Sequence, residues 1–311
     1  MAEISTPVPV AVDAPASGSS QTLKELFAGS VGGIFQVLVG QPFDTVKVRL
    51  QTQPDQYGGM VDCVKKTLQN EGPLAFYKGT LTPLVGIGAC VSVQFGALEA
   101  AKRYFVDHNK SRGLANPSDL NLGQLFLAGS CSGVANSVLS GPIEHIRTRL
   151  QVQPSGADRL YAGPGDFIKK IYGQYGIAGI YKGQGITLVR EFSGYGVYFM
   201  AYEWLMQRYM KNNSVKRSEV PAYMQCLFGA CAGYSLWLAI YPVDSVKSKL
   251  QTDAFDPSKA RYKGMIDCAR KVIREEGLGG LYRGFWPCML RAGPANAATF
   301  VAFEATMKLI S

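Results

Sequence analysis

The chain alternates between long uncharged stretches and shorter basic segments. Four stretches of 18 to 24 residues contain no charged residue: 26–43, 79–98, 120–143 and 222–243. Two more, 183–202 and 284–303, are interrupted by only three charged residues between them. A helix needs about 20 mostly apolar residues to cross a bilayer. The pattern therefore predicts six transmembrane helices, and this even number places both termini on the same side of the membrane.

The sequence also repeats itself. Three segments align without a gap and share a proline followed by an acid and then bases: QPFDTVKVRLQ (41–51), GPIEHIRTRLQ (141–151) and YPVDSVKSKLQ (241–251). A second block follows each of them: EGPLAFYKG (71–79), YGIAGIYKG (175–183) and EGLGGLYRG (276–284). Such self-similarity indicates one structural unit used three times. We expect repeats at 21–110, 121–212 and 221–311, after a disordered tail at 1–20 that is rich in Pro, Ala and Ser.

Within each repeat the order of elements is the same: span, loop, short amphipathic helix, glycine-rich turn, span. The short helices, such as 60–69, have basic residues opposite apolar ones, as a helix at a membrane surface does. A proline inside a helix bends it, so the three prolines should turn the helix ends inward. Small-xxx-small pairs upstream of the prolines should let helix backbones approach closely: Gly29 and Gly33, Gly129 and Gly133, Gly229 and Gly233.

These elements define a fold class. We predict an all-α membrane protein in which six transmembrane helices form a pseudo-threefold barrel of three repeats around a central cavity. Three short amphipathic helices lie on one side of this barrel.

Composition supports a membrane protein and excludes several other classes. The chain is 47% hydrophobic and only 18% charged, although its mean hydropathy is a modest +0.03. The net charge of +9 is spread between the spans instead of forming one patch with interleaved aromatics, so nucleic acid is not an expected partner. Seven cysteines without paired spacing and two histidines predict no metal site. Without a nucleophile elbow or a phosphate-binding loop, neither an enzyme nor a cofactor is expected.

The triplicated Pro-x-Asp/Glu-x-x-Lys/Arg-x-Lys/Arg-x-Gln motif, with its aromatic-Lys/Arg-Gly block, resembles the mitochondrial carrier family over 21–311. The resemblance implies a multi-pass transporter of the mitochondrial inner membrane that works by alternating access, with the short helices on the matrix side. We expect a monomer whose basic amphipathic helices contact anionic lipid. A non-transporting scaffold on the same fold is the alternative from another class.

Three acids stand three residues before three bases in this motif. On one helix the spacing gives local pairs, but its recurrence beside a proline favours pairing of each acid with the base of the next repeat. The resemblance implies that this ring is the matrix gate and that three glutamines brace it. The gate residues are Asp44, Lys47, Glu144, Arg147, Asp244, Lys247, Gln51, Gln151 and Gln251.

The cytoplasmic gate of the family has an incomplete counterpart in LEAAK (98–102), YEWLM (202–206) and FEATM (303–307). Its expected residues are Glu99, Lys102, Glu203 and Glu304. Only Lys102 supplies a base, so at most one ion pair between repeats should form, and an exposed pair contributes about 0–1 kcal/mol. This predicts a resting bias towards the state open to the intermembrane space.

Gly86, Arg190 and Arg291 each lie 13 residues before the cytoplasmic-gate acid of their repeat and so share one depth in the membrane. A charge near the bilayer centre costs about 2.5 kcal/mol or more, which marks a functional site. Adjacent helical residues point about 100° apart, so Arg190 and Glu191 should not easily pair with each other. They would instead offer a cation and an anion to a solute.

By resemblance, the substrate contacts are Gly86, Ile87, Arg190, Glu191 and Arg291. Arg190 or Arg291 should hold a carboxylate through paired hydrogen bonds, and Glu191 should hold an ammonium group. The resemblance therefore implies a small amino acid or a similar zwitterion of the glutamate/glycine type. Acylcarnitine or carnitine, and basic amino acids such as ornithine, lysine or arginine, are the alternatives, although Gly86 and Ile87 offer no acid for a distal cation.

Overall fold

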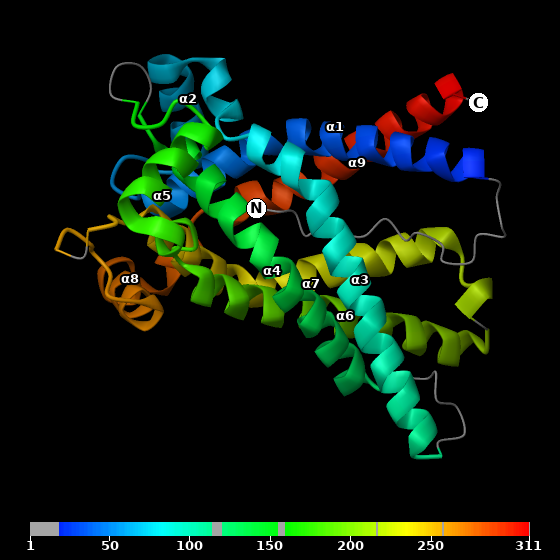
Figure 1. Ribbon diagram of the computed structural model, residues 1–311. Helices are drawn as coiled ribbons and strands as arrows, with labels where there is room; N and C mark the ends of the chain where they lie inside the picture. The colour runs from blue at the N-terminus through cyan, green and yellow to red at the C-terminus, as the bar shows by residue number, and fades with distance from the viewer. Residues whose placement is uncertain (1–18, 114–119, 155–158, 216, 257, 311) are drawn as a thin grey trace.

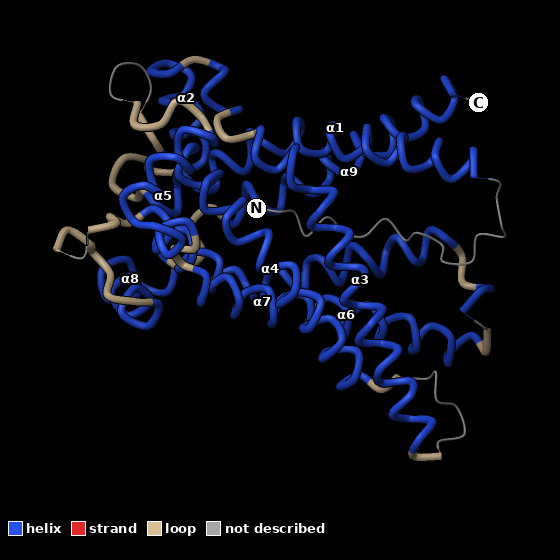
Figure 2. Tube along the Cα trace, viewed as in Figure 1, coloured by secondary structure: helices blue, strands red, loops and turns tan. Residues whose placement is uncertain are grey.

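The computed structural model describes residues 19–113, 120–154, 159–215, 217–256 and 258–310, so nearly all of the predicted tail at 1–20 lies outside it. Within this part of the chain, Figure 2 shows helices joined by loops. The long helices are α1 (Ser19–Thr52), α3 (Leu81–Ser111), α4 (Leu122–Val152), α6 (Gln184–Asn213), α7 (Ala222–Thr252) and α9 (Phe285–Ile310). The shorter elements are α2 (Met60–Glu71), η1 (Pro73–Tyr77), α5 (Pro164–Ile180), η3 (Arg217–Glu219) and α8 (Met265–Gly280).

Each repeat is a long helix, a short helix and a second long helix, as the sequence predicts. The short helices α2, α5 and α8 gather at one end of the molecule, and α1 begins and α9 ends at the opposite end (Figure 1). Helix α1 packs along α9, α4 lies between α3 and α6, and α6 packs on α7. The long helices contain Pro42, Pro142 and Pro242 in their interiors and continue through them.

By length and composition, two described helices, Leu122–Val152 and Tyr223–Thr252, are apolar enough to cross a membrane. A bent pair, Pro73–Gly86 with Gly88–Ser111, passes the same test as one span with a 49° bend. The sequence pattern predicts four clear spans and two interrupted ones, whereas fewer of the described helices are apolar enough by length and composition. The physical reason is composition: the uncharged stretches hold many Gly, Ser, Thr and Gln residues, which carry no charge but lower the mean hydropathy.

Glycines in a left-handed conformation form the turns between the short and long helices. Gly79, Gly183 and Gly284 have φ between 76° and 81°, which a residue with a side chain rarely adopts. They also touch the helix of the following repeat. A Cβ on Gly79 would lie 3.0 Å from the Arg147 carbonyl oxygen, one on Gly284 would lie 2.9 Å from that of Lys47, and one on Gly183 would lie 2.9 Å from Gln251 Cγ. The three turns therefore abut the neighbouring repeats in cyclic order.

The predicted close approach of small-xxx-small pairs holds in repeat 2 and fails in repeat 1. A Cβ on Gly133 would lie 2.5 Å from the Glu191 carbonyl oxygen, so α4 and α6 are in backbone contact there. Gly29 and Gly33 have no such neighbour within 4 Å. Instead Gly32 faces α9, with the Thr299 carbonyl oxygen 3.1 Å from a built Cβ. Helix α1 packs against α9 through a face turned by one residue from the predicted one.

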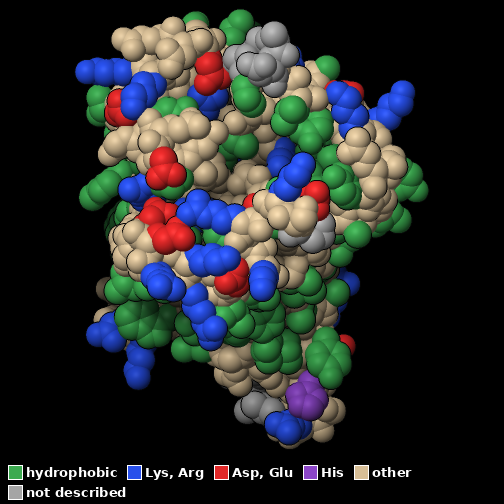
Figure 3. Space-filling model, turned by 90° about the vertical axis from the view of Figure 1, so that its left-hand side faces the viewer, with side chains coloured by type: hydrophobic (Ala, Val, Ile, Leu, Met, Phe, Trp, Pro, Cys, Tyr) green, Lys and Arg blue, Asp and Glu red, His purple; other side chains and the backbone are tan. Residues whose placement is uncertain are grey.

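The end formed by the short helices is strongly charged. Figure 3 looks onto this end and shows lysine and arginine side chains, with acids among them, gathered across its middle, while hydrophobic side chains cover much of the flank below. Each short helix buries one face and leaves an apolar residue exposed at the same place in each repeat. Leu68, Tyr172 and Ile273 are 46%, 58% and 42% exposed. This combination suits a helix at a membrane surface.

Candidate functional site

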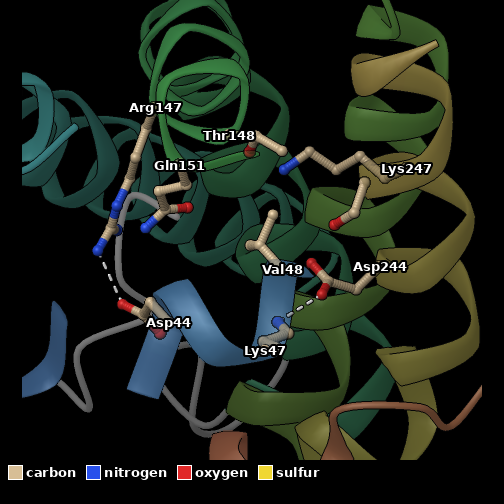
Figure 4. A pocket seen from close by; sticks show the side chains of 9 residues that line it. Asp44, Lys47, Val48, Arg147, Thr148, Gln151, Asp244 and Lys247 are labelled. Atoms are coloured by element: carbon tan, nitrogen blue, oxygen red, sulfur yellow. Dashed lines mark hydrogen bonds and ion pairs between the residues drawn. The ribbon is translucent and has the colours of Figure 1, made fainter. Parts of the chain in front are cut away.

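Six charged side chains form a ring where α1, α4 and α7 converge, two and five residues after their prolines. Arg147 Nη2 lies 2.8 Å from Asp44 Oδ2, Lys47 Nζ lies 2.5 Å from Asp244 Oδ2, and Lys247 contacts Glu144. Figure 4 shows the first two pairs lining a pocket. All six side chains are at most 4% exposed. The acids and bases of the triplicated motif are thus brought together across repeats instead of within one helix.

Burial makes each of these pairs difficult to break from one side. Removing one partner of a buried ion pair leaves an uncompensated charge and costs about 3–5 kcal/mol. Separating α1, α4 and α7 at this end of the bundle therefore requires these buried pairs to be broken.

Of the three glutamines, two make hydrogen bonds. Gln51 Nε2 donates to the Tyr241 hydroxyl at 3.1 Å, and Gln151 Nε2 donates to Thr45 Oγ1 at 3.4 Å. Both side-chain polar atoms of Gln251 are buried without a hydrogen-bond partner in the described part of the chain. The side chain of Gln251 instead packs against the Gly183 turn, and its role as a brace stays a prediction.

Two residues that support the ring were missed by the sequence analysis. Gln41 is fully buried, accepts a hydrogen bond from Arg147 Nη2 and donates one to the Lys78 carbonyl oxygen at 2.8 Å. Tyr241 bonds to Gln51, and Lys47 Nζ lies 5.3 Å from the centre of its ring. Both residues come directly before a motif proline. The signal available in the sequence was a large hydrogen-bonding side chain at this position in repeats 1 and 3.

Arg190 on α6 is completely buried and is bound by protein carboxylates. Its Nη2 donates to Glu144 Oε1 at 2.8 Å and to Oε2 at 3.1 Å, and its Nε lies 3.8 Å from Asp244 Oδ1. It also pairs with Glu191. The expectation that these neighbours do not easily pair is wrong, because the long arginine side chain folds back to the side on which Glu191 lies. In this conformation protein carboxylates occupy Nη2, whereas Nη1 has no hydrogen-bond partner among the described residues.

Arg291 on α9 reaches the same ring from the other side. Its Nη1 lies 3.4 Å from Asp44 Oδ2, and its side chain is 8% exposed. The guanidinium rests on the backbone of α1 at Gly40, where a Cβ would lie only 3.0 Å from Nη1. The two arginines predicted to lie at one depth thus both contact acids of the ring.

Gly86 is buried on α3 against Ile143 of the next repeat. A Cβ at this position would overlap Ile143 Cδ1, so the place where a distal acid would stand is filled by an isoleucine. The side chain of Ile87 lies outside the described side chains.

Several buried polar atoms around Arg190 have no hydrogen-bond partner in the described residues. They are Nη1 and Nε of Arg190, Oε2 of Glu191 and Oδ1 of Asn136, which sequence analysis missed. Buried polar groups are normally satisfied, so unsatisfied ones need a cause. The nitrogens of Arg190 can donate to a carboxylate, and the oxygens of Glu191 and Asn136 can accept from an ammonium group. Together they fit a ligand that carries both groups. The described residues contain no group of His, Cys, Asp and Glu arranged to hold a metal.

At the opposite end of the bundle, the predicted gate residues do not pair between repeats in the described structure. Lys102 Nζ lies 3.4 Å from Glu99 on its own helix. Glu203 pairs at 3.0 Å with Arg217 of η3, a base that the motif did not predict because it lies outside it. Glu304 is exposed.

The last residue of the motif YEWLM (202–206) packs in the protein interior. Met206, where the family motif places a cation, is buried against Val220 and Phe228.

Repeat 2 differs from the others at the end of the short helices. Glu71 binds both Arg49 and Lys78 in repeat 1, whereas Tyr175 takes the place of this acid in repeat 2. Here Lys182 Nζ donates to the Asp253 and Ala254 carbonyl oxygens at 2.6 Å each and lies 4.8 Å from the Phe255 ring centre. An aromatic ring and carbonyl oxygens replace the carboxylate.

This substitution predicts a pH dependence of stability. Burial, with the Arg149 cation nearby, lowers the pKa of Lys182 from 10.5 to about 8. Between these values the folded protein has released the proton while the unfolded chain still binds it, so the free energy of unfolding should rise with pH across this window. A neutral amine keeps two N–H groups for the two carbonyls. Thermal unfolding measured below and above this pH window tests the assignment. The increase in unfolding temperature with pH should be smaller in Lys182→Gln than in the wild type. Equal increases would show that Lys182 is not the group responsible.

Comparisons with known proteins agree with this architecture. The model of the family described as "Mitochondrial carrier protein" matches residues 18–109, 118–213 and 218–311. The chain is 51% identical to the "Glutamate/glycine mitochondrial carrier ymc1" of Schizosaccharomyces pombe, over 93% of this chain and 95% of that protein. It is 45% identical to the "Mitochondrial glycine transporter YMC1" of Saccharomyces cerevisiae, over 95% and 94%. The human "Mitochondrial carnitine/acylcarnitine carrier protein" is 40% identical, over 93% and 95%.

Proposed function

Because the chain belongs to the mitochondrial carrier family, we propose that glycine and glutamate are its own substrates. The family assignment makes the protein a multi-pass transporter of the mitochondrial inner membrane and not an enzyme. The end with the short helices then faces the matrix, and the opposite end faces the intermembrane space.

The observation that carries the substrate proposal is the buried Arg190–Glu191 pair with its unsatisfied atoms. Arg190 Nη1 is a donor for a carboxylate, and Glu191 Oε2 and Asn136 Oδ1 are acceptors for an ammonium group. A guanidinium binds a carboxylate through charge-assisted hydrogen bonds. Glycine presents these two groups on a single carbon, and glutamate adds a second carboxylate. The names of two fungal relatives, a glutamate/glycine carrier and a glycine transporter, support the same substrates.

Site chemistry disfavours both alternatives. The quaternary ammonium of carnitine has no N–H to donate, so it would leave the oxygens of Glu191 and Asn136 unsatisfied. A basic amino acid needs an acid for its distal cation, and the position of Gly86 is filled by Ile143. The human carnitine carrier is also less similar to this chain than the fungal relative from Schizosaccharomyces pombe.

For the transport cycle we propose alternating access with the ion-pair ring as matrix gate. The six charged residues of the ring close the matrix end, whereas the acids at the cytoplasmic end pair locally or are exposed. Substrate would enter from the intermembrane space, exchange with the acids on Arg190, and favour the state in which the ring opens.

For a partner we propose anionic lipid at the short matrix-side helices. Leu68, Tyr172 and Ile273 are exposed on these helices, and lysines such as Lys66 and Lys170 extend from the same elements. An exposed apolar residue beside basic ones is the pattern of a helix in the lipid headgroup region. We further propose that the protein acts as a monomer, since the substrate contacts all come from one chain.

The proposal is tested by uptake into liposomes that contain the purified protein. We expect uptake of glycine and glutamate, with little uptake of ornithine or carnitine. Glu191→Gln keeps the shape of the side chain but removes the charge that pairs with the substrate ammonium, so it should lower uptake of both substrates by at least about tenfold. Uptake of carnitine or ornithine in preference to both amino acids would refute the substrate assignment.

A control for Glu191→Gln is Glu219→Gln, which changes an exposed acid in η3 outside the site. This control should transport as the wild type does. An equal loss in both variants would show that the effect does not arise at the substrate site.

A further inference from the structure

Among the described residues, each acid of the matrix ring contacts at least two cations. One cation is the base of the ring, and the other is an arginine from the depth of the substrate site. The contacts are Asp44 with Arg147 and Arg291, Glu144 with Lys247 and Arg190, and Asp244 with Lys47 and Arg190. Two arginines therefore contact all three gate acids, and any carboxylate that binds these arginines competes with the gate.

The two arginines have different surroundings. Arg190 is followed by Glu191, and the two side chains form a contact pair on α6. This subsite has a cation for a carboxylate and an anion for an ammonium group, so it accommodates the part that glycine and glutamate have in common. Arg291 is followed by Ala292, and it contacts Asp44 across the bundle.

The contact between Arg291 and Asp44 is suited to exchange. Asp44 Oδ2 lies 2.8 Å from Arg147 Nη2 but 3.4 Å from Arg291 Nη1, so the arginine of the ring holds the shared oxygen more closely. If Arg291 bound another carboxylate, Asp44 would keep Arg147 as its partner. The guanidinium itself lies against the backbone of α1 at Gly40.

We propose that Arg291 binds the side-chain carboxylate of a dicarboxylic amino acid and thereby determines transport of glutamate as distinct from glycine. The inference rests on the proposed function, since it divides that substrate site into two parts. The α-carboxylate and α-ammonium groups bind at Arg190 and Glu191, and the side-chain carboxylate replaces Asp44 on Arg291. Glycine has no second carboxylate and leaves the Arg291–Asp44 contact in place.

The test compares uptake of glycine and glutamate by Arg291→Gln in liposomes. Glutamine keeps a hydrogen-bonding side chain at this position but loses the charge, while the Arg190–Glu191 pair is unchanged. We expect the ratio of glutamate uptake to glycine uptake to fall by at least about tenfold relative to the wild type. A parallel loss of both substrates, or no change in either, would overturn the division into two subsites.

Arg103→Gln is the matched control, because Arg103 is an exposed arginine on α3, outside the site. It should transport both substrates as the wild type does. If the wild type transports neither glycine nor glutamate, the proposed function fails, and that outcome is distinct from failure of the subsites.

A second variant covers the case in which Arg291→Gln does not fold. Gly40→Ala keeps every charge but places a methyl group 3.0 Å from Arg291 Nη1, so the guanidinium must shift. We expect a selective decrease of glutamate uptake, smaller than in Arg291→Gln, with glycine uptake preserved. A selective decrease of glycine uptake, or equal uptake changes for the two substrates, would contradict the proposal.

Discussion

Replacing Arg190 by glutamine should abolish uptake of both glycine and glutamate. Its guanidinium is completely buried, donates two hydrogen bonds to Glu144 and pairs with Glu191. A hydrogen bond to a charged group contributes about 1.5–3 kcal/mol, so loss of two such bonds to a bound carboxylate corresponds to at least about a hundredfold loss of transport. Initial rates of uptake into liposomes measure this loss.

The variant also tests whether Arg190 supports the fold. Without its guanidinium, the buried carboxylates of Glu144 and Glu191 lose a shared cation, which costs about 3–5 kcal/mol in comparable sites. We therefore expect a lower thermal unfolding temperature in detergent. Arg190→Lys keeps the charge but not the planar donor fork, so it should recover much of the stability and little of the transport. Near-normal transport by either variant would remove Arg190 from the substrate site.

The second large effect is expected from Gly133→Ala, compared with the equivalent change Gly33→Ala. A Cβ on Gly133 would lie 2.5 Å from the Glu191 carbonyl oxygen, so α4 and α6 must separate to admit it. Such overpacking costs about 1–3 kcal/mol. Gly33 faces nothing within 4 Å, and an alanine there should be neutral or stabilising by up to about 1 kcal/mol, because alanine favours a helix.

Thermal unfolding in detergent measures both variants under the same conditions. Since the displaced backbone carries Glu191, Gly133→Ala should also reduce uptake of glycine, whereas Gly33→Ala should not. Equal unfolding temperatures for the two variants would mean that the close contact in repeat 2 does not constrain the fold.

The ring could be predicted from the sequence because the motif occurs three times, which leaves few ways to pair all of its acids and bases. A single Asp-x-x-Lys spacing fits a local pair on one helix as well as a contact between helices. Three copies, each beside a proline, made a ring across repeats the more economical arrangement, and Lys47, Arg147 and Lys247 do contact acids of other repeats. The depth of Arg190 and Arg291 followed from the same counting.

The direction of side chains could not be read in this way. The angle between adjacent helical positions fixes where a Cβ points, but an arginine has enough rotatable bonds to return to its neighbour, as Arg190 does to Glu191. The face of α1 that contacts α9 could not be predicted either. Gly32 and Gly33 are both glycines, and only the position of α9 in the fold decides that Gly32 makes the contact. Arg217 lay outside any motif, so its pairing with Glu203 had no signal.

The glycine turns after the short helices have a mechanical consequence. Gly79, Gly183 and Gly284 each press on the base-bearing helix of the following repeat, and the last of them returns to the first helix. A tilt of one repeat should therefore displace the helix of the next repeat, and because the contacts are cyclic, this displacement reaches all three repeats. Motion at the matrix end should then be concerted, with the three repeats swinging together rather than one at a time.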